Sequence, residues 1–346
     1  METLLRPSPF LVLSTFHPQT SYSSLNPPFF SNKAVSSSRK VHDRIKSSKF
    51  DSVLDLEPTR KSESLDFDVS WIDPSDHRSR RFDLIIIGAG PAGLSLAEQA
   101  SRYGIRALED WLDRTWPMSC VYINDHKTRY LDRAYGRVRR KELKLKLLNG
   151  CVSNEVKFHK AKVWKIEHQE FESSVVFSDG SELKASLIVD ASGFTSHFIE
   201  YDKPRNHGYQ IAHGILAEVD DHPFDLDEMV LMDWRDSHLG NEPYLQKDNS
   251  KYPTFLYAMP FSSNLTFLEE TSLVSRPVLS YMDVKKRMVA RLRHLGIKVK
   301  SVIEVEKWLI PMGGPLPRIP QSVMAIGGDS GIVHPSTAYR WLGQWL

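Results

Sequence analysis

The chain of 346 residues is poor in cysteine, in net charge and in long apolar runs. Its two cysteines, Cys120 and Cys151, have neither the spacing of a metal site nor the number that a disulfide framework needs. A formal net charge of +2 gives no basis for nucleic-acid binding. No apolar stretch reaches the length of a membrane-spanning helix before glycine or charge interrupts it. We therefore expect a globular protein of a reducing compartment that binds neither nucleic acid nor metal, with peripheral membrane contact left open.

Acidic residues are also nearly absent from the first 49 residues, where none occurs between Glu2 and Asp43. This region is rich in serine, carries several arginines and lysines, and contains prolines that prevent a long helix. Such a composition is typical of an organelle transit peptide, and the many hydroxyl side chains favour a plastid. We predict that residues 1–49 are a disordered plastid transit peptide, with a plain disordered tail as the alternative. Residues 50–81 are expected to form a linker.

What the chain does contain is a nucleotide-binding pattern directly after this linker. An apolar strand over residues 82–87 leads into Gly88, Gly90 and Gly93, and a helix-forming segment follows at once. This order opens a dinucleotide-binding βαβ unit. The three glycines would make the tight turn, admit a pyrophosphate and let the helix pack on the strand, while the helix amides face the anion. A glycine-rich turn that binds nothing is the alternative.

Two acidic residues are candidates to complete this nucleotide site. Glu109 stands at the distance from Gly88 where a ribose-binding acid is expected, although the strand before it is short. Asp190 lies within a buried-looking strand, 187–193, that ends in small residues and would return beside the glycine turn. The remaining elements expected here are a basic helix over 137–148 that ends near Asn149-Gly150, a third strand over 156–158, and a β-meander over 162–167, 174–177 and 182–187.

A second nucleotide signal lies near the end of the chain. An apolar strand ends in Gly328-Asp329, where the aspartate would reach a ribityl chain. An early Gly-x-Gly-x-x-Gly and a late Gly-Asp together favour FAD over NAD. We predict an α/β fold, with a Rossmann-like FAD-binding domain of the two-dinucleotide flavoprotein type built from 82–200 and 311–346, and a mixed α+β substrate-binding domain from 201–310. The latter includes a helix capped by Asp283, with Val284, Met288, Leu292 and Leu295 on one face and Gly296 after its end.

Several segments together resemble the plant lycopene β-cyclases, with most similarity to the branch that contains the chromoplast-type cyclases and the capsanthin–capsorubin synthases. The resemblance covers nearly everything from Asp51 to about Tyr339. The segments that carry it are Asp132-Arg133 with Tyr135-Gly136-Arg137, Met232 to His238, Phe267-Leu268-Glu269-Glu270-Thr271, Pro311-Met312-Gly313-Gly314-Pro315-Leu316-Pro317 and Val333-His334-Pro335-Ser336.

The resemblance implies a plastid enzyme, peripheral to membranes, that uses reduced FAD with NADPH as its reductant and takes a carotenoid substrate. It implies that Glu269 is the catalytic acid and that His334 handles protons near the flavin. Because neighbouring residues on a strand point to opposite faces, Glu270 is expected to turn away. We expect Asp233, Arg235 and Asp236 to form an ion network, whereas the aromatic residues of this region fit either a core or a cation-stabilising pocket: Phe255, Tyr257, Phe261 and Phe267.

The chain departs from the family at two places. Relatives carry an additional block between Ile105 and Leu112, with the second nucleotide strand and its acidic residue. They also continue through a helical region after Tyr339, where this chain ends at Leu346.

The leading interpretation is a cyclase that converts lycopene ends to β-rings by acid–base chemistry without net redox change. The alternatives are contraction of an epoxy-xanthophyll ring to a cyclopentyl ketone, an FAD monooxygenase, or an inactive remnant.

Overall fold

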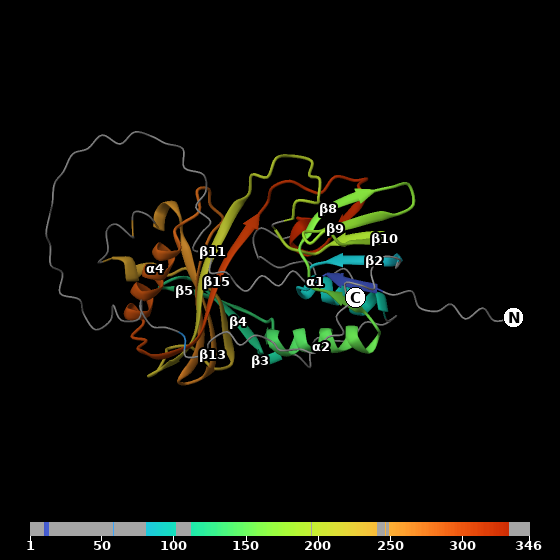
Figure 1. Ribbon diagram of the computed structural model, residues 1–346. Helices are drawn as coiled ribbons and strands as arrows, with labels where there is room; N and C mark the ends of the chain where they lie inside the picture. Colours follow the sequence, from blue (N-terminus) through green and yellow to red (C-terminus); the bar gives the residue numbers. More distant parts are fainter. Residues whose placement is uncertain are drawn as a thin grey trace, which may run out of the picture.

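The computed structural model describes residues 10–13, 58, 81–101, 112–194, 196–240, 246 and 249–331. Its strands form two large β-sheets that lie side by side, with helices on both (Figure 1). The two longest strands of the second sheet, β11 (Gly208–Val219) and β15 (Val299–Met312), reach toward the first sheet. The fold is thus a mixed α/β arrangement, as predicted.

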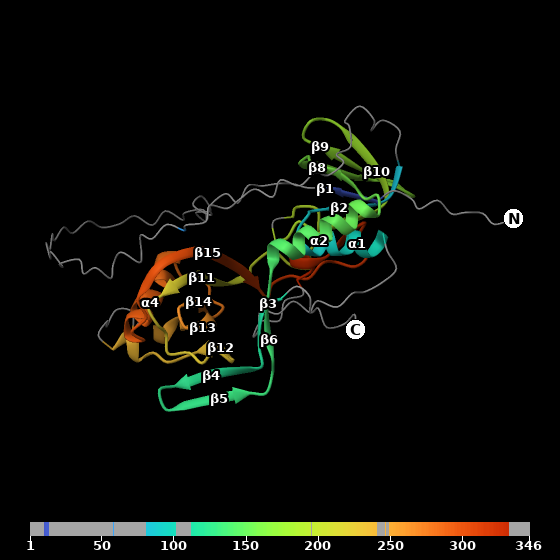
Figure 2. The ribbon, with the colours of Figure 1, turned by 90° about the horizontal axis from the view of Figure 1, so that it is seen from below.

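The first sheet is built around β2 (Arg81–Ile87), whose residues from Leu84 to Ile87 are all buried. A continuous apolar run suits a parallel strand that is covered on both faces. On one face pack α1 (Pro91–Ser101) and α2 (Arg140–Ser153), which lie together in Figure 2. The strand order is β7 (Lys157–His159), β1 (Phe10–Leu13), β2, β10 (Glu182–Asp190), β9 (Ser173–Phe177) and β8 (Val163–His168), with β16 (Val323–Ala325) beside β10.

The N-terminal region differs from its prediction at four residues. Phe10–Leu13 form β1, which pairs in parallel with β2 on one side and with β7 on the other. The sequence predicted no regular structure before residue 50, because prolines and serines surround this short apolar stretch. Strand β1 lies in the sheet position next to β2, where a second nucleotide strand was expected from residues near Ile105.

The second sheet has one face covered by α4 (Tyr281–His294), which buries Val284, Met288 and Leu292. The predicted cap was wrong by three residues: Ser280 caps the helix, and its hydroxyl accepts the Asp283 N–H at 3.1 Å. The strand order is β15, β11, β14 (Leu265–Ser272), β13 (Thr254–Ser262), β12 (Glu228–Asp233), β4 (Met118–Asn124) and β5 (Lys127–Leu131).

The second sheet also contains strands from the first half of the chain. Strands β4 and β5 come from residues assigned to the nucleotide domain, and β3 (Leu112–Trp116) pairs with β6 (Tyr135–Val138) between the two sheets (Figure 2). Helix α2 begins three residues later than expected and continues past Gly150 to Ser153. No described helix is long and apolar enough to cross a membrane.

Candidate functional site

The glycine turn between β2 and α1 has the geometry that a nucleotide site requires. Gly88 has a φ of +108°, and a Cβ there would lie 2.6 Å from the Ala191 carbonyl oxygen. A Cβ on Gly93 would lie 2.0 Å from the Gly88 carbonyl oxygen, so α1 packs directly on the turn. A Cβ on Gly90, in contrast, would meet no described atom within 4 Å. Gly88 and Gly93 are therefore required by close packing, and the space at Gly90 is open to a ligand.

Asp190 lies beside this turn, as predicted, but its carboxylate is used inside the protein. The side chain is fully buried and accepts hydrogen bonds from the Ser192 N–H, at 2.9 Å, and from the Ser196 hydroxyl. Such a pattern stabilises the turn after β10. Asp190 thus holds the backbone that packs against Gly88, and its carboxylate is not free to bind a ribose.

A small pocket lies where the ends of β11 and β15 meet the turn that begins at Gly327. Gly328 lines this pocket, and the turn, η5 (Gly327–Ser330), carries the predicted Gly-Asp pair. The side chain of Asp329, together with Glu109 and His334, lies outside the described residues, and their roles stay predictions. The remaining lining residues are Phe194, Tyr201, Arg205, His207, Pro311, Gly313, Pro315 and Gly331.

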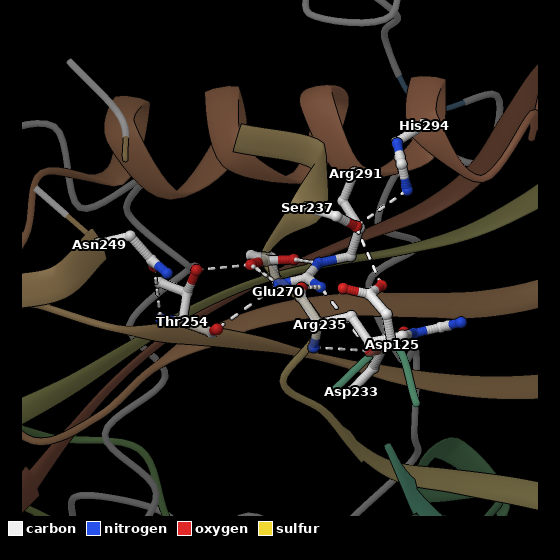
Figure 3. A network of polar contacts seen from close by, with 9 residues as sticks. All are labelled: Asp125, Asp233, Arg235, Ser237, Asn249, Thr254, Glu270, Arg291 and His294. Carbon is white, nitrogen blue, oxygen red and sulfur yellow. Dashed lines mark hydrogen bonds and ion pairs between the residues drawn. The ribbon is translucent and has the colours of Figure 1, made fainter. Parts of the chain in front are cut away.

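The two neighbouring glutamates of β14 point to opposite faces of the second sheet. Glu270 faces α4, is fully buried, and accepts hydrogen bonds from Arg291 at 2.8 and 3.0 Å and from the Thr254 hydroxyl at 2.6 Å. Figure 3 shows this contact in a network that continues to Asp233, which binds Arg235 through both carboxylate oxygens at 2.8 and 2.5 Å. The predicted ion network is present for Asp233 and Arg235. Glu270 is part of the packing between sheet and helix.

Glu269 occupies the other face, which α4 does not cover. The residue as a whole is half-buried, and its carboxylate accepts a hydrogen bond from the Thr271 hydroxyl at 3.0 Å. Burial and, to a smaller extent, the nearby charge of Glu306 raise the pKa of Glu269, while Thr271 and Arg140 lower it, and the net pKa is about 7. A carboxyl with a pKa in this range can hold a proton at neutral pH and give it to a substrate.

The face around Glu269 is lined by aromatic and apolar side chains. Tyr257 pairs with Glu269 across β13 and β14, and Phe267 lies one position along on the same face. Phe261 contacts Trp116 edge to face, with ring centroids 5.7 Å apart. Phe255 is fully buried and packs on Tyr257 at 5.1 Å. The four predicted aromatic residues therefore share one sheet face with the predicted acid, and Phe255 belongs to its packed core.

Three residues near Glu269 were missed by sequence reasoning: Gly214, Glu306 and Arg140. Gly214 pairs with Glu269 on one side and with Glu306 on the other. Arg140 at the start of α2 hydrogen-bonds Glu306. These contacts join residues up to 166 positions apart, and no local pattern encodes such a pairing. Of the three, only Glu306 lies close to a segment that carries the family resemblance. It stands five residues before the Pro311 to Pro317 segment.

The pocket and Glu269 lie at different places along β11. His207, directly before β11, lines the pocket, while Gly214 next to Glu269 is six residues beyond Gly208. Six residues of extended strand span about 20 Å. The pocket and the acid therefore lie at separate places along this strand. In the described part of the chain, no group of three or more His, Cys, Asp or Glu is placed to hold a metal ion.

Among solved structures, the fold is similar to a geranylgeranyl bacteriochlorophyll reductase-like protein from Thermoplasma acidophilum. The TM-score is 0.57 at 12% identity, with 75% of this chain and 74% of that chain covered.

Sequence relatives are much more similar. Neoxanthin synthase of Solanum lycopersicum is 66% identical, and capsanthin/capsorubin synthase of Capsicum annuum is 64% identical. The lycopene beta cyclase of Capsicum annuum is 48% identical. Each comparison covers 98% of this chain and 73% of the relative.

The alignment with the tomato protein spans 366 positions against the 346 residues of this chain, so the relative has at least 20 residues without a counterpart here. This agrees with the predicted internal gap, whose position stays a prediction. The family model described as "Lycopene cyclase protein" matches residues 102–342. The chain therefore belongs to the lycopene cyclase family.

Proposed function

We propose that this protein is a plastid carotenoid cyclase that converts the linear ends of lycopene to β-rings by acid–base chemistry. The observation that carries the proposal is the contrast between the two glutamates of β14. Glu270 is bound by Arg291 and Thr254, whereas Glu269 faces an aromatic surface with a pKa raised to about 7. The three sequence relatives named above are described as chloroplastic or chromoplastic, and this supports a plastid location.

In this reaction Glu269 gives its proton to the terminal double bond of the substrate. The neighbouring double bond attacks the resulting cation and closes the ring, and a ring proton then leaves, so the substrate mass is unchanged. The apolar face around Phe267 keeps water from the cation, and the aromatic ring faces stabilise its charge. Burial of the carboxyl group raises its pKa to about 7, so that a substantial fraction of the acid carries its proton near neutral pH.

The glycine turn and the pocket support FAD as the cofactor. The open space at Gly90, the N-terminal amides of α1 and the turn at Gly328 would hold a pyrophosphate, and Asp329 would hold the ribityl chain. Bound in reduced form, FAD supplies electron density that favours a cationic substrate, and we propose NADPH as its reductant. Glu109 is proposed to bind the ribose and His334 to handle protons near the flavin. We also propose peripheral contact with the membrane that holds the carotenoid.

A second candidate reaction is the contraction of an epoxy-xanthophyll ring to a cyclopentyl ketone. It is favoured by the higher identity to the two synthases than to the lycopene beta cyclase. Protonation of an epoxide oxygen needs an acid in the same place, so Glu269 would serve both substrates.

The test is expression of the full chain in bacteria that accumulate lycopene, or in extracts supplied with an epoxy-xanthophyll, followed by pigment analysis. We expect β-carotene, or the ketone, at unchanged mass, and at least a 100-fold loss of conversion in Glu269→Gln, since general acids contribute about 10²–10⁴-fold. Conversion should fall as the pH rises above about 7, because the acid then loses its proton. Glu218→Gln, at an exposed residue near the end of β11, is the matched control.

Three outcomes would contradict the proposal. A product with added oxygen and stoichiometric use of NADPH would indicate a monooxygenase. Unchanged pigments beside an active relative would indicate a remnant. Full activity of Glu269→Gln would show that another group is the acid.

A further inference from the structure

A row of side chains crosses the second sheet at Glu269. In the register of the strands, Tyr257 of β13, Glu269 of β14, Gly214 of β11 and Glu306 of β15 are consecutive partners. Paired residues of antiparallel strands present their side chains on the same face. Glu269 and Glu306 therefore lie on one face, two strand spacings or about 10 Å apart at their backbones.

The residue between the two carboxylates is a glycine, and its missing side chain leaves room for them. A Cβ on Gly214 would lie 3.2 Å from Oε2 of Glu269 and 2.8 Å from the tip of the Phe267 ring. The carboxyl group of Glu269 thus already leans over Gly214, in the direction of Glu306. Any larger residue at this position would separate the two acids.

Glu306 is held in place by three groups from other positions. Its carboxylate accepts hydrogen bonds from Arg140 and from the Trp308 ring N–H, the latter at 3.0 Å, and Arg137 lies 3.6 Å away. Arg137 is itself engaged by Asp113 at 2.7 Å and by Glu304 at 3.6 Å. These three contacts fix the position of the Glu306 carboxylate on this face of the sheet.

We propose that Glu306 is a positioning residue for Glu269: an anion fixed by Arg140 and Trp308 across Gly214, which keeps the facing carboxyl group protonated between turnovers. The proposal rests on the proposed role of Glu269 as the acid. The reaction needs one proton delivered and one removed. When Glu269 has given up its proton, two anions face each other in a half-buried site, and this repulsion favours uptake of the departing ring proton at the same place.

The other charged and polar groups on the face of Glu269 come from α2, β6, β13, β14 and β15, and the phenol of β13 is Tyr257, the cross-strand partner of Glu269. Arg140 and the Thr271 hydroxyl lower the pKa of Glu269, whereas burial and Glu306 raise it. Arg137, which lies over the Phe261 and Phe267 rings at 5.5 and 5.2 Å, is balanced by Asp113 and Glu304. Removing Glu306 or Arg140 should consequently shift the proton affinity of Glu269 in opposite directions.

The test is an infrared titration of the purified full-length protein without substrate. The carbonyl band of protonated Glu269 is identified as the band that Glu269→Gln removes, and its midpoint is followed with pH. We expect a midpoint near 7 in the unaltered protein. In Glu306→Gln the midpoint should fall by about half a pH unit or more, because a like charge is removed. Glu306→Asp should retain most of the shift.

Two further variants separate this effect from general damage to the fold. Arg140→Gln should raise the midpoint, the opposite sign from Glu306→Gln, which loss of packing would not produce. Glu304→Gln is the matched control: it lies two residues away on β15, also near Arg137, and should leave the midpoint unchanged. An unchanged midpoint in Glu306→Gln, or no protonated band at pH 6, would overturn the proposal. Since the titration needs no substrate, it decides this point even if the chain converts no carotenoid.

Discussion

Gly90 and Gly93 stand three residues apart and are glycines for different physical reasons. Gly93 is fixed by the protein itself, since any side chain would run into the Gly88 carbonyl at 2.0 Å. Gly90 meets no such obstacle among the described atoms. The space beside Gly90 is therefore free of described atoms, and in the proposed function a nucleotide pyrophosphate would occupy it.

This difference predicts two distinct outcomes for substitution by alanine. Gly90→Ala should keep the melting temperature within about 2 °C of the unaltered protein and lose the flavin absorbance of the purified chain, because the new methyl group enters the ligand space. Gly93→Ala should lower the melting temperature whether or not flavin is present. Retention of flavin absorbance by Gly90→Ala would contradict the assignment of this turn as the cofactor site.

At the scale of elements, local sequence patterns predicted several helices and strands correctly. The elements whose ends were misplaced are those whose residues are set by packing against distant parts of the chain. The β-meander was predicted because the Ser-Asp-Gly turn, with Gly180 at a φ of +83°, is encoded locally. The end of α2 was placed too early because Asn149-Gly150 reads as a stop. In the structure a Cβ on Gly150 would lie 2.7 Å from the Glu98 side chain, so this glycine serves the contact with α1. The row of Glu269, Gly214 and Glu306 depends on strand register, which local patterns do not reveal.

Helix α4 is joined to the sheet by buried charges, and this gives a prediction for its stability. Arg291→Ala would leave Glu270 buried without its cation, which costs about 3–5 kcal/mol in the free energy of unfolding. Arg293→Ala, exposed on the same helix, should change it by less than about 0.5 kcal/mol. Urea denaturation of both variants measures the difference. Equal stabilities would show that the network in Figure 3 contributes little to the packing of α4.

At the scale of the whole molecule, the first sheet has continuous pairing only because of β1. After α1 the chain continues to β3, which pairs with β6 and not with the nucleotide sheet. The position between β2 and β7 is taken instead by Phe10–Leu13, paired on both sides. A strand with two partners stabilises both neighbours, since it satisfies backbone groups that would otherwise lie at an open edge.

The stability of the first sheet should therefore depend on whether a truncation of the N-terminal region removes β1. Removal of residues 1–9 leaves β1 intact and should not change the melting temperature. Removal of residues 1–13 deletes β1, exposes the facing edges of β2 and β7, and should lower the melting temperature by about 4–8 °C, which corresponds to ~2 kcal/mol in a domain of this size. Thermal unfolding followed by circular dichroism compares the two truncations, which differ by only four residues. Equal melting temperatures would mean that β1 adds no stability to the nucleotide sheet, and that residues 1–13 can be removed without opening it.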